Sequence, residues 1–269
     1  MDISIETITP AVARKMLQAN TDNRPLTEAF VQRYASDIQA GQWVNDGSPI
    51  RFSCSGRLLD GQHRLMAVVA SGGQIDAVVI RGLDDDAFET MDTGKPRTAA
   101  DVLAINGAKN FTCAASIAAA WIYYNAHGHP GSRGGADKAR NGDILRVYQE
   151  TPEIAEAASF HGSRKWIRAH IGAGMFGALY VAACKRGERG TMLQFFNELI
   201  SPTGLAIGTS VMPLRDRLIE DKASREKMGR AMQGAYLFKS YRDFRDRRTV
   251  KQLKVVLNNG RLTKEHFAL

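Results

Sequence analysis

Five polar residues between two apolar runs are the best candidates for chemistry in this sequence. The stretch LLDGQHRLMAVV contains, in succession, Asp60, Gly61, Gln62, His63 and Arg64. A carboxylate, an imidazole and a guanidinium can together bind a phosphate, hold a divalent ion or move a proton. The same residues would also suit an ordinary polar turn that caps a helix. Both interpretations stay open at this point.

Each of these residues has a role if the stretch connects a strand to a helix. Asp60 is predicted to cap the helix by accepting N–H bonds from its first turn, and Gly61 permits a positive φ or a close approach of a ligand. The N–H groups of that turn form an anion site, which His63 and Arg64 would flank. Asp60 is also the predicted ligand of Mg²⁺, which usually takes one or two carboxylates plus phosphate oxygens. These parts fit a phosphate better than a carboxylate or a sugar.

The elements that must position this stretch follow from the surrounding pattern. They are a helix over 24–41, a hairpin with strands over 49–53 and 57–59, a helix from the stretch to Ser71, a buried strand over 75–81 and a helix over 98–105. The helices are indicated by apolar residues at helical spacing between start and stop signals. The strands are indicated by short apolar or β-branched runs bounded by turn residues.

From Ala114 onward the pattern is helical. Helices are predicted over 114–126, 141–150, 152–160, 174–186, 190–200, 211–221 and 228–245. Strand-like alternation is nearly absent there. We therefore predict an α+β protein with two domains, an α+β domain over 1–107 and an all-helical domain with a basic C-terminal segment over 108–269.

The positive charge is concentrated near the C-terminal end. The net charge is +8, and residues 213–269, with 15 Lys or Arg and 7 Asp or Glu, account for the whole excess. A basic segment indicates an anionic partner, nucleic acid first, while a solvated helical face is the alternative. The predicted nucleic-acid contacts are Arg245, Arg247, Arg248, Lys251 and Lys254. The aromatic residues interleaved with cations over 236–244 are expected to pack into the helical domain instead.

Cysteine usage and hydropathy exclude several classes of protein. Cys54, Cys113 and Cys184 lie far apart without metal-ligand spacing, so neither disulfides nor a zinc site is expected. The sequence has no run of about 18 apolar residues, so no membrane span is expected. No secretory signal is recognised at the N-terminus. A cytoplasmic protein is predicted.

Two motifs give the sequence a resemblance to a known superfamily. The order helix, G-x-W, hairpin, DGQHRL-x-A, strand and then MDTGKPRTAADVL resembles the ParB/sulfiredoxin-like superfamily, in particular its DGQHR-type members from phages and mobile elements. The similarity covers roughly residues 20–105. It implies a domain with a small mixed sheet whose corresponding turn binds nucleotide phosphates. In that superfamily ParB proteins hold CTP there, sulfiredoxins hold ATP, and some relatives act as small-molecule kinases.

The resemblance also implies roles for individual residues. The phosphate-contacting turn would comprise Gly61, Gln62, His63 and Arg64. Arg24 looks like the basic residue that opens the first helix of this fold and reaches the nucleotide. Asp92 and Arg97 lie in the region that supplies polar nucleotide or metal contacts in relatives. The implied cofactor is Mg²⁺ with ATP or CTP.

Departures from the family narrow the expected function. Sulfiredoxin has a nucleophilic cysteine immediately before the His-Arg pair, where this chain has Gln62, so reduction of a sulfinic acid is excluded. ParB partition proteins have an Arg-rich turn and a following helix-turn-helix, whereas this turn has His63 and the best candidate, over 154–172, is cut short by glycines. We therefore predict binding of ATP or CTP and its hydrolysis or phosphoryl transfer, with Asp60, His63 and Arg64 as catalytic residues, in the nucleic-acid or nucleotide metabolism of a phage or mobile element.

Two other functions remain open. The chain could be a non-catalytic DNA-binding regulator that uses the fold as a scaffold, which predicts salt-sensitive DNA affinity without nucleotide turnover. It could also be a metal-dependent ParB-like nuclease in which Asp60 and His63 act on the phosphodiester backbone. Nucleotide turnover, DNA binding and DNA cleavage, each compared between the wild type and His63→Ala, would separate the three.

Overall fold

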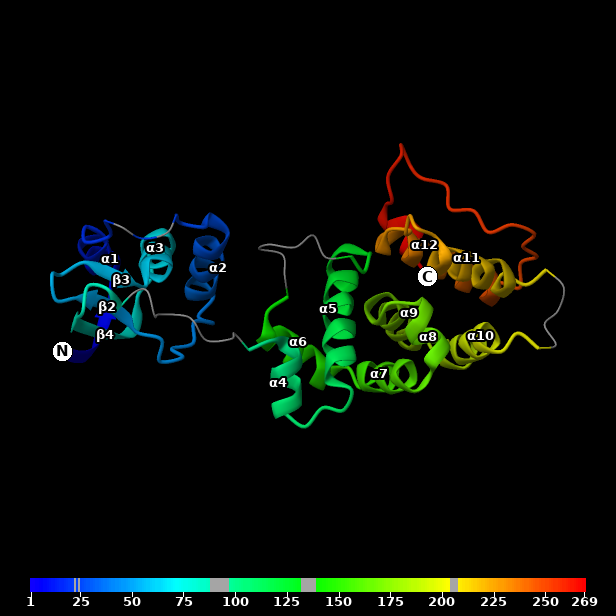
Figure 1. Cartoon of the computed structure of the whole chain (residues 1–269), viewed down its shortest axis with the longest axis horizontal. Helices are drawn as coiled ribbons and strands as arrows, with labels where there is room; N and C mark the ends of the chain where they lie inside the picture. The colour runs from blue at the N-terminus through cyan, green and yellow to red at the C-terminus, as the bar shows by residue number, and fades with distance from the viewer. Residues whose placement is uncertain (22, 24, 88–96, 132–138, 204–207) are drawn as a thin grey trace. The chain divides into compact units, whose positions relative to one another are not determined.

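The computed structural model describes residues 1–21, 23, 25–87, 97–131, 139–203 and 208–269. Over these residues the protein is a mixture of a small sheet and many helices, as the sequence predicts (Figure 1). The chain divides into two compact units, Met1–Lys95 and Pro96–Leu269. Each unit has its own buried core and is described by itself.

The first unit contains the sheet. Its elements are β1 (Asp2–Ile8), α1 (Pro10–Leu17), α2 (Glu28–Gln39), β2 (Ile50–Ser53), β3 (Leu58–Asp60), α3 (Gln62–Ser71) and β4 (Ile75–Leu83). The strand order is β1-β4-β2-β3. β4 is antiparallel to β1 and parallel to β2, and β2 is antiparallel to β3. The sheet is therefore small and mixed, and the predicted hairpin and the helix after it are both present.

The core of the first unit holds the end of β3 against the start of α3. Along β4 the alternate residues Ile75, Ala77 and Val79 are buried, as expected for a strand with one covered face. They pack with Ile50 of β2 and Leu65 of α3, both fully buried, in one apolar cluster. Ile50 precedes the β3–α3 junction in the chain and Leu65 follows it. Because both are buried in the same cluster, the core fixes the orientation of α3 relative to the hairpin.

Two elements of the first unit were not predicted from the sequence. β1 pairs with β4 along its whole length, from Asp2 opposite Arg81 to Ile8 opposite Ile75, yet Ile5 is 76 % exposed. Its alternating isoleucines thus do not mark a buried face, and the strand depends on a partner far along the chain. α1 follows directly, with the Thr9 side chain accepting the Val12 N–H at its start.

The second unit is helical. Its elements are α4 (Ala99–Ile105), α5 (Phe111–His127), α6 (Asn141–Glu150), α7 (Glu153–Ser163), α8 (Lys165–His170), α9 (Ala173–Lys185), α10 (Arg189–Ile200), α11 (Val211–Ala223), α12 (Arg230–Arg245) and the 3₁₀ turn η3 (Lys264–Phe267). All seven helices predicted after Ala114 are confirmed. Among the described residues, no helix combines the length and apolar character needed to cross a membrane.

The boundary between the two domains differs from the sequence prediction. α4 was placed in the domain ending at residue 107, but it packs on α5 and α6, and Leu103 is fully buried in the helical core. The second unit therefore starts before α4. The segment 154–172 forms no helix-turn-helix, in agreement with the sequence analysis, because only Arg164 separates α7 from α8. α8 has six residues, one of which, Ile167, is fully buried.

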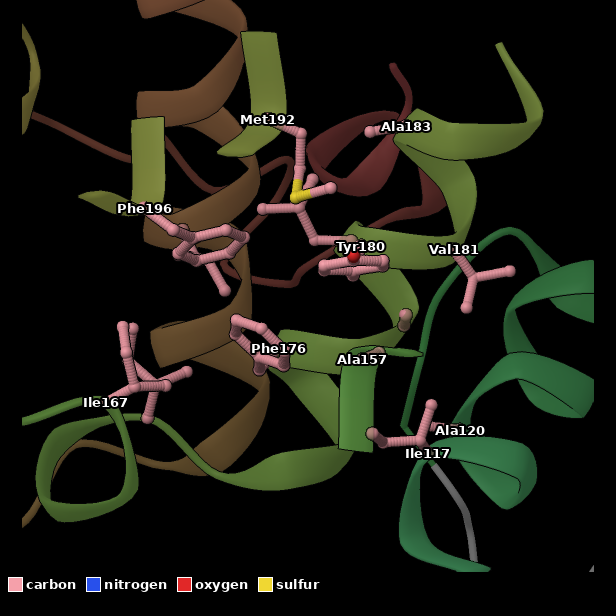
Figure 2. Packing of buried hydrophobic residues seen from close by; sticks show 14 of the residues in the cluster. Ile117, Ala120, Ala157, Ile167, Phe176, Tyr180, Val181, Ala183, Met192 and Phe196 are labelled. Carbon is pink, nitrogen blue, oxygen red and sulfur yellow. The ribbon is translucent and has the colours of Figure 1, made fainter. Parts of the chain in front are cut away.

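Aromatic side chains fill the core of the second unit (Figure 2). Phe176 and Tyr180 of α9 are buried, and the Phe176 ring lies 4.6 Å from that of Phe196 between centroids. α9 also passes close to α5, because a Cβ at Gly177 would lie 2.4 Å from side-chain carbons of Ile117. Phe238 and Tyr241 of α12 are fully buried as well, which confirms that these two aromatic residues of the 236–244 stretch pack into the domain.

The three cysteines are free, and their surroundings predict very different reactivities. Cys54 is exposed, whereas burial raises the pKa of Cys113 and of Cys184 to about 11. Because the thiolate is the reacting species, only a small fraction of the latter two is reactive near pH 8. An aromatic disulfide reagent should therefore modify Cys54 rapidly in the native protein and Cys113 and Cys184 only after unfolding. A Cys54→Ser variant should lack the rapid phase, and a rapid phase that persisted would contradict these environments.

Candidate functional site

The DGQHR residues lie at the junction between β3 and α3. β3 ends at Asp60 and α3 begins at Gln62, with Gly61 as the N-cap residue at φ +106° and no side chain capping the helix. A Cβ at Gly61 would lie 3.0 to 3.3 Å from three side-chain carbons of Ile50. Glycine is therefore required here both by the left-handed backbone and by the close packing on β2.

The structure corrects the role of Asp60 as a helix cap. Its Oδ1 accepts the N–H of Gly61 at 2.7 Å, and its Oδ2 accepts hydrogen bonds from Arg51 at 2.9 Å and Arg64 at 3.1 Å. Asp60 is the last residue of β3 and lies opposite Arg51 in the hairpin register. Its carboxylate is thus directed across the hairpin and not over the first turn of α3.

The same contacts bear on Asp60 as a metal ligand. Both carboxylate oxygens are occupied by donors, two of them guanidinium groups. Within the described ranges, no group of three or more His, Cys, Asp or Glu side chains is close enough to hold a metal ion. Asp60 thus already accepts three hydrogen bonds, and its role as a ligand of Mg²⁺ stays a prediction.

Arg64 ties α3 to the segment before β2. Its Nη2 donates to the Pro49 carbonyl at 2.7 Å and to Asp60, and its Nη1 donates to the Ser48 carbonyl. The side chain is only 14 % exposed. The planar fork of a guanidinium suits this set of acceptors, so the first role of Arg64 is to position the junction, with its positive charge kept beside it.

His63 connects the junction to α2. Its Nε2 accepts the N–H of Thr27, the N-cap residue of α2, at 3.0 Å. The imidazole ring also lies edge-on to Phe30, with 6.1 Å between centroids. These two contacts hold the His63 ring against the start of α2.

Gln62 is buried in a network of amides that sequence reasoning missed. The side chain is 6 % exposed, and its Oε1 accepts from Asn20 Nδ2 at 3.2 Å. Asn23 Nδ2 donates to Asn20 Oδ1 at 2.7 Å and to the Leu58 carbonyl at 2.6 Å. No periodic or motif signal marked Asn20 and Asn23, because their role depends on distant partners. Together with Thr27 they hold the chain before α2 against the motif.

Three other predicted nucleotide contacts have different outcomes. Arg24 and Asp92 lie outside the described residues. Arg97 is exposed and belongs to the second unit, where its carbonyl accepts a hydrogen bond from Asn141 Nδ2 at 2.9 Å. The contribution of all three to a nucleotide site stays a prediction.

The predicted nucleic-acid contacts fall into two groups. Arg245 is 22 % exposed and paired with Asp246 at 2.8 Å, and Arg248 is paired with Asp246 at 3.0 Å. The charges of these two are therefore largely compensated. Arg247, Lys251 and Lys254 are exposed and follow the end of α12. These three offer their charge to solvent or to a partner.

A buried thiol–imidazole pair in the second unit is also a candidate for chemistry. Cys113 Sγ lies 3.5 Å from His161 Nδ1, and His161 Nε2 lies 3.0 Å from the Ile171 carbonyl. Burial raises the pKa of Cys113 to about 11 and lowers the pKa of His161. Both groups are therefore neutral near pH 7, which favours a structural hydrogen bond over an activated nucleophile.

Comparisons with known proteins add no relative. No family model matches the chain, and searches of curated proteins and of solved structures give no match either. The resemblance to the ParB/sulfiredoxin-like superfamily therefore rests on the sequence motifs and stays a prediction. Over the described residues, the structure has a small mixed sheet in the first unit and helices in the second.

Proposed function

We propose that the β3–α3 junction binds the phosphates of a nucleotide, ATP or CTP. The observation that carries the proposal is the start of α3 at a left-handed glycine with no side-chain cap. The first N–H groups of a helix have no intrahelical partner, and the helix dipole makes this end positive. A phosphate group satisfies both conditions, and the superfamily resemblance names the same turn.

The charges beside the junction support an anionic ligand. At contact distance, the guanidinium groups of Arg51 and Arg64 share the single carboxylate of Asp60. One positive charge of this trio is therefore not compensated within it. Arg64 is held by two carbonyls and Arg51 by the hairpin register, so these cations are already in place before a ligand arrives.

In this proposal Mg²⁺ would accompany the nucleotide and offset part of its phosphate charge, and the Asp60 carboxylate positions Arg51 and Arg64. Hydrolysis or phosphoryl transfer depends mainly on positioning and charge neutralisation. The first-turn N–H groups of α3 would orient the phosphates, and the two guanidinium groups would offset their charge. This proposal names no general base among the residues that the structure describes, so turnover is a proposal separate from binding.

Titration calorimetry of the full chain with ATP, CTP, GTP and UTP, with and without Mg²⁺, tests binding. His63→Glu and His63→Gln form a matched pair, because each side chain keeps an acceptor for the Thr27 N–H and they differ in charge. We expect His63→Gln to retain affinity within a few-fold and His63→Glu to lose about tenfold or more, since a carboxylate beside the helix start repels phosphate. Equal affinity of the pair, or no binding by the wild type, would overturn the proposal.

A second partner, nucleic acid, is favoured by the exposed cations after α12. Arg247, Lys251 and Lys254 are exposed there, and uncompensated cations provide the salt-dependent part of nucleic-acid affinity. A nucleic-acid partner is also what the two alternative functions, a DNA-binding regulator and a nuclease, require. A nuclease would cleave DNA without added nucleotide, and a regulator would bind DNA without nucleotide turnover.

A further inference from the structure

The chain between α12 and η3 contains a hairpin turn that sequence analysis did not single out. Asn258 and Arg261 form an antiparallel bridge, with each N–H donating to the other carbonyl at 3.0 Å. Between them, Asn259 and Gly260 have φ of +49° and +74°. Two left-handed residues in succession, Asn-Gly, are typical of a type I′ turn, the tight connection of a two-stranded hairpin.

We call residues 254–264 the arm. In Figure 1 the orange-to-red chain between α12 and η3, which contains the arm, projects beyond α11 and α12 of the same unit.

The base of the arm is fixed to the helical core. His266 Nε2 lies 2.8 Å from the Val256 carbonyl, and Asn258 Nδ2 donates to Glu265 Oε2 at 3.1 Å. Arg242 of α12 donates to the carbonyls of Glu265 and Ala268 at 2.9 and 3.0 Å. Behind these contacts Phe267 is buried. These contacts therefore attach the base of the arm to η3 and α12 of the helical unit.

The arm and the residues before it are uniformly basic. Between residues 247 and 264 the sequence has six Lys or Arg and no Asp or Glu, namely Arg247, Arg248, Lys251, Lys254, Arg261 and Lys264. All six are exposed. Over the part of the chain that the structure describes, Arg248 alone among them forms an ion pair with a carboxylate. A surface of this charge favours a strongly anionic partner.

Two apolar side chains beside the turn narrow the chemistry of that partner. Val256 is 76 % exposed and Leu257 is 36 % exposed. Between Lys254 and Arg261, they present an apolar contact flanked by cations. The floor of the DNA major groove has apolar contact points in the thymine methyl groups, and its rim is lined with phosphates.

From these observations we infer that the arm docks into the major groove of duplex DNA, with Lys254 and Arg261 on phosphates and Val256 toward the bases. This inference rests on the proposed nucleic-acid partner. The arm has a single bridge, between Asn258 and Arg261, and the major groove of B-DNA is wide enough for such a turn, whereas that of duplex RNA is too deep and narrow. Residues 247–264 contain no aromatic residue on which single-stranded bases would stack. Two apolar side chains offer far less surface than the apolar face of a membrane-bound helix.

Fluorescence anisotropy with a labelled duplex of about 20 base pairs, titrated with the full chain over a salt series, tests the inference. Arg261→Gln should weaken binding about threefold to fivefold near 50 mM salt and reduce the salt slope by about 0.9, the value for one phosphate contact. Val256→Ser should weaken binding without changing that slope. Arg225→Gln is the matched control, because Arg225 is an exposed cation of the same unit outside the arm, and it should leave both quantities unchanged.

Three outcomes would overturn the inference while leaving the nucleic-acid partner in place. They are equal binding by Arg261→Gln, Val256→Ser and the Arg225→Gln control, tighter binding to a single strand of the same length, and tighter binding to duplex RNA. Absence of binding by the wild type at low salt to duplex DNA, to the single strand and to duplex RNA alike would overturn the nucleic-acid partner itself, and binding to anionic phosphatidylserine vesicles alone would do the same. Circular dichroism melting of each variant confirms that it is folded, which is expected because the substituted side chains are exposed.

Discussion

Replacing Phe176 with alanine is expected to lower the free energy of unfolding of the helical unit by about 3–5 kcal/mol, the usual cost of truncating a buried aromatic side chain. Phe176 is fully buried, and its ring lies 4.6 Å from that of Phe196 and 5.8 Å from those of Phe160 and Tyr180. The space it leaves cannot close easily, because the neighbouring Gly177 already holds α9 close to α5. The effect should therefore be near the upper end of that range.

Chemical denaturation followed by tryptophan fluorescence measures this change. Trp121 and Trp166 lie in the helical unit and Trp43 in the first unit, so a Trp43→Phe background reports on the helical unit alone. Phe111→Ala is the matched control, since Phe111 is 42 % exposed at the start of α5, and it should cost less than about 1 kcal/mol. A cost for Phe176→Ala no larger than for this control would contradict the packing of the aromatic core.

Gly61→Ala is expected to destabilise the first unit by about 2–3 kcal/mol. A left-handed backbone costs an L-residue roughly 1–2 kcal/mol, and the new Cβ would also press on Ile50 at 3.0 to 3.3 Å. Gly72→Ala separates the two causes. Gly72 ends α3 with φ +70°, but nothing lies within 4 Å of a Cβ there, so this variant should show the backbone cost only.

The measurement is denaturation followed by Trp43 fluorescence in a background of Trp121→Phe and Trp166→Phe. Gly61→Ala should also weaken nucleotide binding more than Gly72→Ala does. A shift at Gly61 moves the first N–H groups of α3, whereas Gly72 lies at the other end of the helix. Equal destabilisation by the two variants would show that the contact with Ile50 is relieved at no cost. In that case the glycine at position 61 would be explained by its φ alone.

Most of the helices could be predicted from the sequence, because their signals are local. Apolar spacing located the seven helices after Ala114, and the pattern of 49–71 located the hairpin and α3. β1 could not be predicted in the same way. Its isoleucines alternate, but Ile3 and Ile5 are exposed, and the strand is stabilised by β4, whose partner residues lie more than 60 positions away.

For the candidate site, the sequence by itself determined where the polar residues lie, a strand-to-helix junction with a glycine before the helix. Only the tertiary structure decided what those side chains do. Asp60 accepts a hydrogen bond from Arg51 across the hairpin, and Arg64 donates to the carbonyls of Ser48 and Pro49. Gln62 accepts a hydrogen bond from Asn20. The physical reason is the distance along the chain over which each kind of interaction acts. Backbone conformation responds to near neighbours in the chain, whereas a polar side chain takes the partners that folding brings within hydrogen-bond distance.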